Sequence, residues 1–227
     1  TTADNNTAVG KSALQANTTG TNNTAMGQNA GVSVTTGVEN ILIGNQAGDA
    51  LIDADHNVAM GYASLSADTY GSQSTAIGHF ALHAQNFTSA TDTNNTAVGF
   101  HAGISVTTGA NNTFVGGLAG DANTTGAGNT GIGKNALGGN TTAAANTAVG
   151  TNAMLANTTG ASNVAVGHQA LDSNTTASNN VAVGKDALQA NTTGANNTAV
   201  GYLALDANTT AANNTAVGRD SLGANTT

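Results

Sequence analysis

The 227-residue chain is poor in the residues that fill an ordinary globular core, since only 3% are aromatic and none is Trp, Pro or Cys. Charged residues make up 7%, and the formal net charge is -8 with only four Lys and Arg. An acidic chain with so few cations lacks the attraction on which nucleic-acid binding depends, so we expect no nucleic-acid partner. The apolar runs are also too short for a transmembrane helix, so we expect no membrane insertion of this segment.

A 17-residue repeat runs along the whole chain, and its most regular feature is a glycine that follows a β-branched residue or Met. These column glycines lie 17 residues apart, except for one interval of 21; they are Gly10, Gly27, Gly44, Gly61, Gly78, Gly99, Gly116, Gly133, Gly150, Gly167, Gly184, Gly201 and Gly218. The repeat is too short for a helical pair, and its Gly and Asn content disfavours helix. We therefore expect an all-β parallel β-solenoid over residues 1–227, with about thirteen coils. Because the chain begins and ends within a repeat, we expect it to be a segment of a longer chain.

Each coil is predicted to start with a short strand, at residues 7–9 in the first repeat. Thr7 and Val9 are β-branched, as are most of their equivalents, and the small residue Ala8 stands between them. Residues two apart share one face of a strand, and β-branched residues favour strands. We expect the β-branched pair to line the interior and Ala8 to lie on the opposite face.

The position directly after the column glycine accepts Lys, Arg, Gln, Tyr, His, Phe and Thr, so it is expected to face solvent, and any recognition surface is expected there or at the next residue. Residues 13–16, Ala-Leu-x-Ala, are predicted to form a second short strand, with Ala13 small enough for two backbone layers to approach closely. Residues 17–20, Asn-Thr-Thr-Gly, are predicted to form the return turn.

An Asn recurs at the fourth position before the column glycine, as at Asn6, Asn23 and Asn40, and Ser74 is the exception. In stacked coils these amides would form a ladder, bonding either one another or turn backbone. The simpler alternative is an Asn that only favours the turn.

The Asn-Thr-Ala-Val-Gly-x-x-Ala unit, as at residues 6–13, resembles the head repeats of YadA-like trimeric autotransporter adhesins. It is also similar to the Asn-Thr-Ala-Val-Gly repeats of phage tail-fibre-like and bacterial surface proteins. The resemblance covers essentially the whole chain. It implies a left-handed β-roll and a homotrimeric fibre at a cell surface or on a virion.

The long interval between Gly78 and Gly99 contains four extra residues, which we expect to bulge from the coil near residues 86–92. Phe80, Asn86, Phe87 and Asp92 belong to this coil, and they are predicted to form a contact loop because aromatic residues are otherwise scarce. The alternative is a tolerated insertion with Phe87 packed over the coil.

Residues with catalytic or metal-binding chemistry form no recognisable motif. There is no Cys, no phosphate-binding loop and only one Glu, Glu39, so we expect no enzymatic activity. Asp49, Asp53 and Asp55 match no calcium loop and are interpreted as a solvated acidic turn. His79, His83 and His101 are interpreted as exposed histidines, so no metal or cofactor is predicted.

Asn-x-Thr sequons could carry glycans in an exported protein, and those considered are Asn17, Asn22, Asn123, Asn157 and Asn191. The alternative is that Asn-Thr-Thr recurs only because these residues favour a turn.

The predicted function is that of an extracellular structural module, in a surface adhesin, a phage tail fibre or a surface filament, which acts as a spacer and a contact surface. Self-association is the expected partnership, together with a host-surface glycan or protein. The alternative is a ligand-binding solenoid that binds glycan, or that binds ice through the column formed by Thr18, Thr19 and their equivalents.

Overall fold

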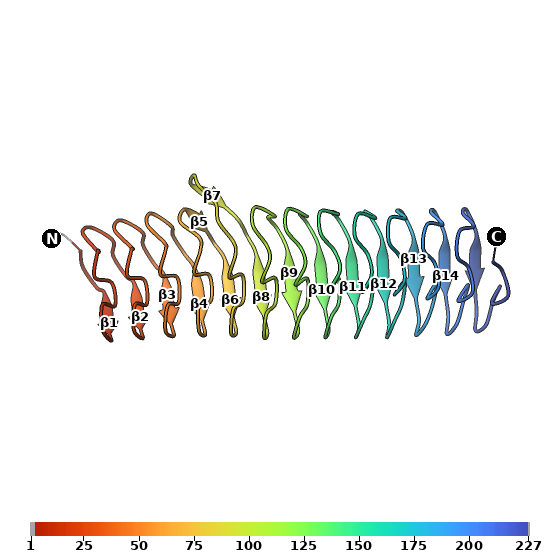
Figure 1. The fold of residues 1–227 in the computed structure, drawn as a ribbon, viewed down its shortest axis with the longest axis horizontal. Helices are drawn as coiled ribbons and strands as arrows, with labels where there is room; N and C mark the ends of the chain where they lie inside the picture. Colours follow the sequence, from red (N-terminus) through yellow and green to blue (C-terminus); the bar gives the residue numbers. More distant parts are fainter. Residues whose placement is uncertain (1–2, 227) are drawn as a thin grey trace. The chain divides into compact units, whose positions relative to one another are not determined.

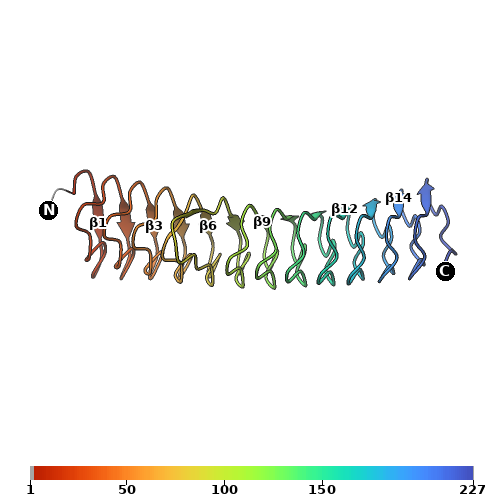
Figure 2. The ribbon, with the colours of Figure 1, turned by 90° about the horizontal axis from the view of Figure 1, so that it is seen from above.

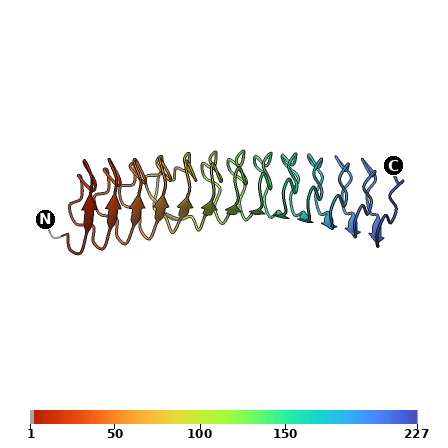
Figure 3. The ribbon, with the colours of Figure 1, turned by 90° about the horizontal axis from the view of Figure 1, so that it is seen from below.

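The computed structural model describes residues 3–226, and it divides after Asn112 into two compact units, called unit 1 and unit 2. In each unit the chain winds into coils whose equivalent residues are 17 positions apart, except for a spacing of 21 between β6 and β8 of unit 1, and the strands follow one another along one side of the coils (Figures 2 and 3). The described residues contain no helix. The predicted all-β parallel β-solenoid is confirmed, while its left-handed sense and the homotrimer stay predictions.

The main sheet of unit 1 is parallel, and each strand pairs with its equivalent in the next coil, as Thr7 does with Thr24. Its strands, in order, are β1 (Thr7–Val9), β2 (Thr24–Met26), β3 (Ile41–Ile43), β4 (Val58–Met60), β6 (Thr75–Ile77) and β8 (Thr96–Val98). A small second sheet pairs β5 (Gly71–Ser72) with β7 (Thr91–Asp92).

Unit 2 repeats the same parallel arrangement without an insertion. Its strands, in order, are β9 (Thr113–Val115), β10 (Thr130–Ile132), β11 (Thr147–Val149), β12 (Val164–Val166), β13 (Val181–Val183), β14 (Thr198–Val200) and β15 (Thr215–Val217).

The strands face the opposite way from the prediction. In β2 the middle residue, Ala25, is fully buried, whereas Thr24 is half-buried and Met26 is exposed. The same pattern holds along both units wherever a coil has a neighbour on each side, so the β-branched residues point outward. The coil interior is so narrow that it holds an alanine at most of these middle positions, because another backbone layer packs directly behind the strand.

The predicted second strand at residues 13–16 is absent. This segment is a succession of tight turns in which Ser12 and Leu14 adopt φ values of 60° and 49°. Turn bonds within the coil, such as Ala13 N to Gly10 O, alternate with bonds to the next coil, such as Leu14 N to Ala30 O. The alternating backbone turns the alanine and leucine side chains inward together, which a strand could not do because its side chains alternate between faces.

The leucine of this segment is replaced by glycine in some coils, and a packing reason is visible. A Cβ on Gly31 would lie 2.6 Å from Leu42 Cδ1, and one on Gly120 would overlap the Phe114 ring. Leu42 and Phe114 occupy the strand position that alanine usually holds. A large strand residue therefore fills the space that the turn leucine occupies in other coils, so the interior volume stays nearly constant.

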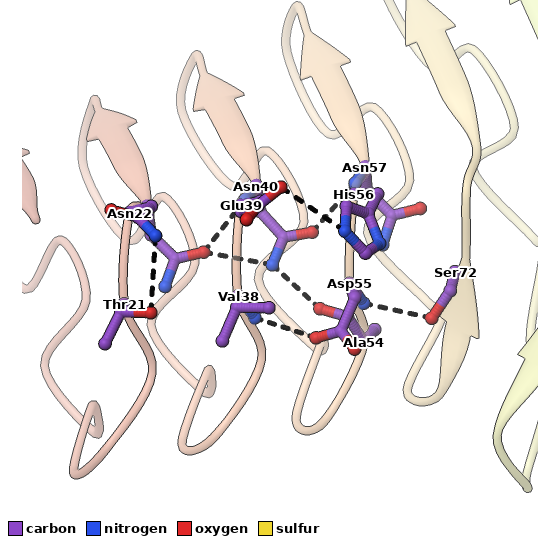
Figure 4. Close-up of polar contacts among 11 residues, drawn as sticks. Thr21, Asn22, Val38, Glu39, Asn40, Ala54, Asp55, His56, Asn57 and Ser72 are labelled. Carbon is purple, nitrogen blue, oxygen red and sulfur yellow. Dashed lines mark hydrogen bonds and ion pairs between the residues drawn. The ribbon is translucent and has the colours of Figure 1, made fainter.

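The predicted Asn ladder is confirmed, and it makes both kinds of bond that were considered. Asn40 Nδ2 donates to Asn23 Oδ1 (3.0 Å) and to the carbonyl oxygen of Ala54 (2.7 Å) (Figure 4). Asn40 Oδ1 in turn accepts from the backbone N–H of Asn57 (2.9 Å). Since these residues are fully buried, each amide satisfies backbone groups that would otherwise be unpaired inside the coil.

A second buried ladder, which the sequence analysis did not anticipate, runs along the return turns of unit 2. Asn157 Nδ2 donates to Asn140 Oδ1 (2.8 Å) and to the carbonyl oxygen of Gly160 (2.9 Å). Asn174 and Asn191 continue the same pattern. In unit 1 three of the equivalent positions are apolar, at Val34, Leu51 and Val106, so the second ladder is interrupted there by apolar packing.

Candidate binding surfaces

The first and third residues of each three-residue strand form an outward surface, which we call the strand face of each unit. None of these residues is charged. The third position carries Val, Met or Ile throughout, and Met26 and Met60 are 43% and 37% exposed. An outward sheet face that carries no charge in any coil, and whose third position is apolar in every coil, is a typical contact surface.

A second surface is formed by the two residues that follow each column glycine. The side chains directly after the glycine are exposed in both units, as predicted; examples are Lys11, Gln28 and Asn45 in unit 1, and Lys134, Thr151 and His168 in unit 2. The residues one position further on are half-buried or, in fewer coils, buried or exposed. The prediction that the position after the glycine faces solvent is confirmed.

Six rings gather at this second surface in unit 1, and we call them the ring cluster. Tyr62, His79, Phe80, Phe100 and His101 belong to the surface, and His83, five residues after Gly78, lies beside Phe80 with 4.7 Å between the ring centroids. The His79 ring stacks between Tyr62 and Phe100, with centroids 5.2 and 5.6 Å away. Phe80 meets His79 edge-on at 4.4 Å, and Phe100 stacks on His101 at 3.8 Å. These contacts join three successive coils, so the rings form one continuous cluster rather than isolated side chains.

The four residues of the predicted contact loop do not form one site. Phe80 belongs to the ring cluster, whereas Phe87 is only 9% exposed and packs against the coil. Asn86 and Asp92 are exposed and flank the tip of the loop, which extends beyond the neighbouring turns and carries β7 (Figure 1). The bulge lies where it was predicted. Its Phe87 is not part of a contact loop, however, but packs over the coil, as the alternative interpretation predicted.

A buried polar network lies beneath this loop. Asp68 Oδ1 accepts from the backbone N–H groups of Gly71 (3.1 Å) and Phe87 (2.9 Å), and Gln85 Nε2 donates to Asp68 Oδ2 (2.6 Å). Gln85 also donates to Ser74 Oγ (2.8 Å), and its Oε1 accepts from Asn95 (2.9 Å). Ser74, the exception in the Asn ladder, therefore stands where the network needs a shorter side chain.

Burial raises the pKa of the Asp68 carboxyl above its usual value of 3.8, although the hydrogen bonds from Gln85, Phe87 and Gly71 act in the opposite direction. Because the folded state binds the proton more tightly than the unfolded state, the free energy of unfolding falls as the pH rises through the interval between the two pKa values. Above the raised pKa, the loss is complete and no further change comes from this residue.

We expect Asp68→Asn to remove this part of the pH dependence, because an amide does not ionise. The measurement is denaturant unfolding of both proteins at several pH values from about 4 to about 7. As the pH rises, the free energy of unfolding of the wild type should fall relative to that of the variant, because only the wild type loses the Asp68 proton. Asp92→Asn, at an exposed position of the next coil, is the control, and a difference for Asp68→Asn that changes with pH no more than the control's would contradict the expectation.

The structure contradicts the predicted glycosylation at three of the five asparagines. Asn123, Asn157 and Asn191 are fully buried, and their Nδ2 atoms, to which a glycan would be attached, donate hydrogen bonds inside the coil. A glycan there would be incompatible with the fold. Asn17 is half-buried and bonds the Gly20 carbonyl oxygen, whereas Asn22 is exposed. Glycosylation at these two residues stays a prediction.

The acidic turn and the histidines form no recognisable metal centre. Asp53 accepts from the Thr36 hydroxyl (2.6 Å), and Asp55 accepts from the backbone N–H of Val38 (2.8 Å), so both serve the turns. Burial raises the pKa of the Asp49 carboxyl. Among residues 3–226, no three His, Asp or Glu side chains are grouped so that they could hold a metal ion.

In unit 2 the position directly after the column glycine carries charged side chains, and no ring cluster is found there in the described residues. Lys185 Nζ donates to Asp186 Oδ2 (2.6 Å), and the Lys185 ammonium and Arg219 guanidinium lie 5.4 and 5.5 Å from the centroid of the Tyr202 ring. Tyr202 is therefore flanked by cations, whereas Tyr62 in unit 1 is flanked by other rings.

The described part of the chain shows no pocket, and it has no helix that is long and apolar enough to cross a membrane. No known family model, curated protein or solved structure matches the chain. The candidate binding surfaces are therefore the strand face and the residues after the column glycines.

Proposed function

We propose that the chain is a structural module of an extracellular fibre or filament, in a surface adhesin, a phage tail fibre or a surface filament, and that it self-associates through the strand face. The spacer role is supported by the way each coil binds the next through the same strand pairing and buried Asn bonds. In such arrays stability is a sum of coil and neighbour terms, so length can grow without a larger core.

The observation that carries the proposal is the exposed, charge-free strand face. The narrow interior is filled by alanine, one or two larger apolar residues and the ladder asparagines, while the β-branched and Met side chains of the strands remain outside. Covering Met26, Ile41 and Met60 would remove apolar surface from water at about 25 cal/mol per Å².

The partner that fits this face best is a second copy of the chain. An identical solenoid has the same spacing between coils, about 4.8 Å along the sheet, so its side chains can interdigitate at every coil rather than at one point. Each added coil then contributes to the interface. The resemblance to adhesin head repeats implies that three copies associate.

We expect the double variant Met26→Lys with Met60→Lys to be monomeric at a concentration where the wild type is oligomeric, because two unpaired ammonium groups would have to be buried in the interface. The molar mass is measured by light scattering after size exclusion, and three times the chain mass is expected for the wild type. Circular dichroism should be unchanged, since lysine can extend into solvent from an exposed strand position.

Gln28→Lys with Asn45→Lys is the matched control, because it adds the same charge at a position where Lys11, Lys134 and Lys185 occur naturally. This control should remain oligomeric. A monomeric wild type would refute self-association.

Ice binding is the second candidate for the same surface. The predicted column at Thr18 is partly used by the fold, since the Thr18 hydroxyl donates to the Thr35 carbonyl oxygen (3.1 Å). The strand face offers a regular surface instead, on which Thr, Val, Ile and Met repeat from coil to coil. A monomeric wild type with thermal hysteresis that Met26→Lys with Met60→Lys abolishes would favour this candidate.

A further inference from the structure

The second surface of unit 1 consists of two columns of residues, the first and the second after each column glycine. Apart from Lys11 and the histidines, these columns carry no ionisable cation or carboxylate, and they combine two kinds of side chain. Amides occupy both columns in the second and third coils, at Gln28, Asn29, Asn45 and Gln46. The ring cluster follows directly, starting at Tyr62. The only Lys, Arg, Asp or Glu in these columns of unit 1 is Lys11, in the first coil.

The rings are accessible as well as clustered. Tyr62 is 44% exposed and Phe100 is 54% exposed, and His79 between them is also exposed. The ring contacts hold the side chains together without a ligand, so little rotational freedom remains to be lost on binding. A ligand would therefore meet a preorganised aromatic surface next to a row of hydrogen-bonding amides.

We propose that the ring cluster and the neighbouring amides form a binding surface for a neutral glycan. The aromatic face carries a negative quadrupole, which attracts the weakly positive C–H groups on the flat side of a pyranose ring. Amides both donate and accept, so they suit sugar hydroxyls. A glycan chain lying along the coils would meet a side chain at every step of about 4.8 Å.

The charge pattern decides between this ligand and others that stack on rings. Nucleic acid also stacks on aromatic side chains, but it needs cations along its backbone, and these columns of unit 1 supply only Lys11. An acidic glycan needs cations for the same reason. A cationic ligand would be favoured by exposed carboxylates, which both columns of unit 1 lack; the Asp49 carboxyl, which interacts with His83, is half-buried outside the columns. A neutral sugar is the class that this surface matches, whether or not the chain self-associates through the strand face.

The test is calorimetric titration of the whole chain with cellohexaose, mannohexaose and maltohexaose, at a pH where histidine is neutral. We expect at least one of these neutral glycans to bind. Tyr62→Ala and Phe100→Ala should each weaken binding at least about tenfold, which corresponds to about 1.4 kcal/mol. Phe100→Tyr, which keeps a ring, should bind within about threefold of the wild type, since stacking on a ring tolerates such a change.

Tyr202→Ala is the matched control, because Tyr202 follows a column glycine in unit 2 and is 40% exposed, but it has no aromatic neighbour in the described structure. It should leave the affinity unchanged. The proposal is overturned if none of the three glycans binds, or if polythymidylate or hyaluronan binds as tightly as they do. It is also overturned if Tyr62→Ala lowers the oligomer mass without affecting glycan binding, because the ring cluster would then be an interface between copies.

Discussion

Gly167→Ala is expected to destabilise unit 2 by at least about 4 kcal/mol, a loss that single substitutions seldom reach. Gly167 has a φ of +139°, and an added Cβ would lie 2.5 Å from the carbonyl oxygen of Gly184 in the next coil. The backbone conformation alone costs an L-residue about 1–3 kcal/mol. The remainder comes from the overlap with rigid backbone, which forces the two coils apart and breaks the strand pairing between them.

The measurement is denaturant unfolding followed by circular dichroism, with hydrogen exchange to locate the effect on either side of Gly167. Two other glycines of unit 2 separate the causes. A Cβ on Gly117 would meet nothing within 4 Å, so Gly117→Ala should be nearly neutral. Gly218 has a φ of +124° and equally open surroundings, so Gly218→Ala should show the conformational cost alone. Equal losses for Gly167→Ala and Gly218→Ala would show that coil contact contributes nothing.

The position of the strands and the first Asn ladder could be predicted because both follow from the repeat itself. A repeat of constant length places equivalent residues beside one another in a solenoid, so an Asn at one position becomes a column. Asn23 and Asn40 behave in this way. The bulge near residue 90 was predictable for the same reason, since extra residues between strands that stay in phase must leave the coil.

The direction in which the strands face could not be read from alternation, which shows only that Thr24 and Met26 share a face. We assigned the β-branched face to the interior, as in most sheets. The structure reverses this because the coil is thin enough for Ala25 to fill it. The relevant signal was size: the middle position is alanine in all but three strands, where it is Leu42, Phe114 or Gly131, whereas the outward positions exchange Thr, Val, Ile and Met freely.

The second segment was misassigned because Ala-Leu-x-Ala looks like an apolar strand, and a leucine with positive φ is uncommon. Leu14 adopts that conformation nonetheless, with a φ of 49°. Gly31 and Gly48 stand at the equivalent position in other coils, and this exchange of leucine with glycine was the available indication of positive φ. The ring cluster was missed because its members come from three coils and become neighbours only when the coils stack.

The central claim is that each coil keeps its small residues inside and its β-branched and Met residues outside, and β2 provides adjacent positions that test it. Ala25 is fully buried and Met26 is 43% exposed. Lysine at position 25 would place an unpaired ammonium group and a long side chain in a space that holds one methyl group, at a cost of several kcal/mol. Lysine at position 26 would extend into solvent at a cost of about 1 kcal/mol or less.

The most direct measurement is therefore the thermal unfolding of Ala25→Lys and Met26→Lys, followed side by side by circular dichroism under conditions where the protein is monomeric. The outward-facing strand predicts that Met26→Lys keeps the wild-type spectrum and nearly the wild-type melting temperature, whereas Ala25→Lys loses the cooperative transition of unit 1. The reverse order, with Ala25→Lys tolerated and Met26→Lys unfolded, would contradict it.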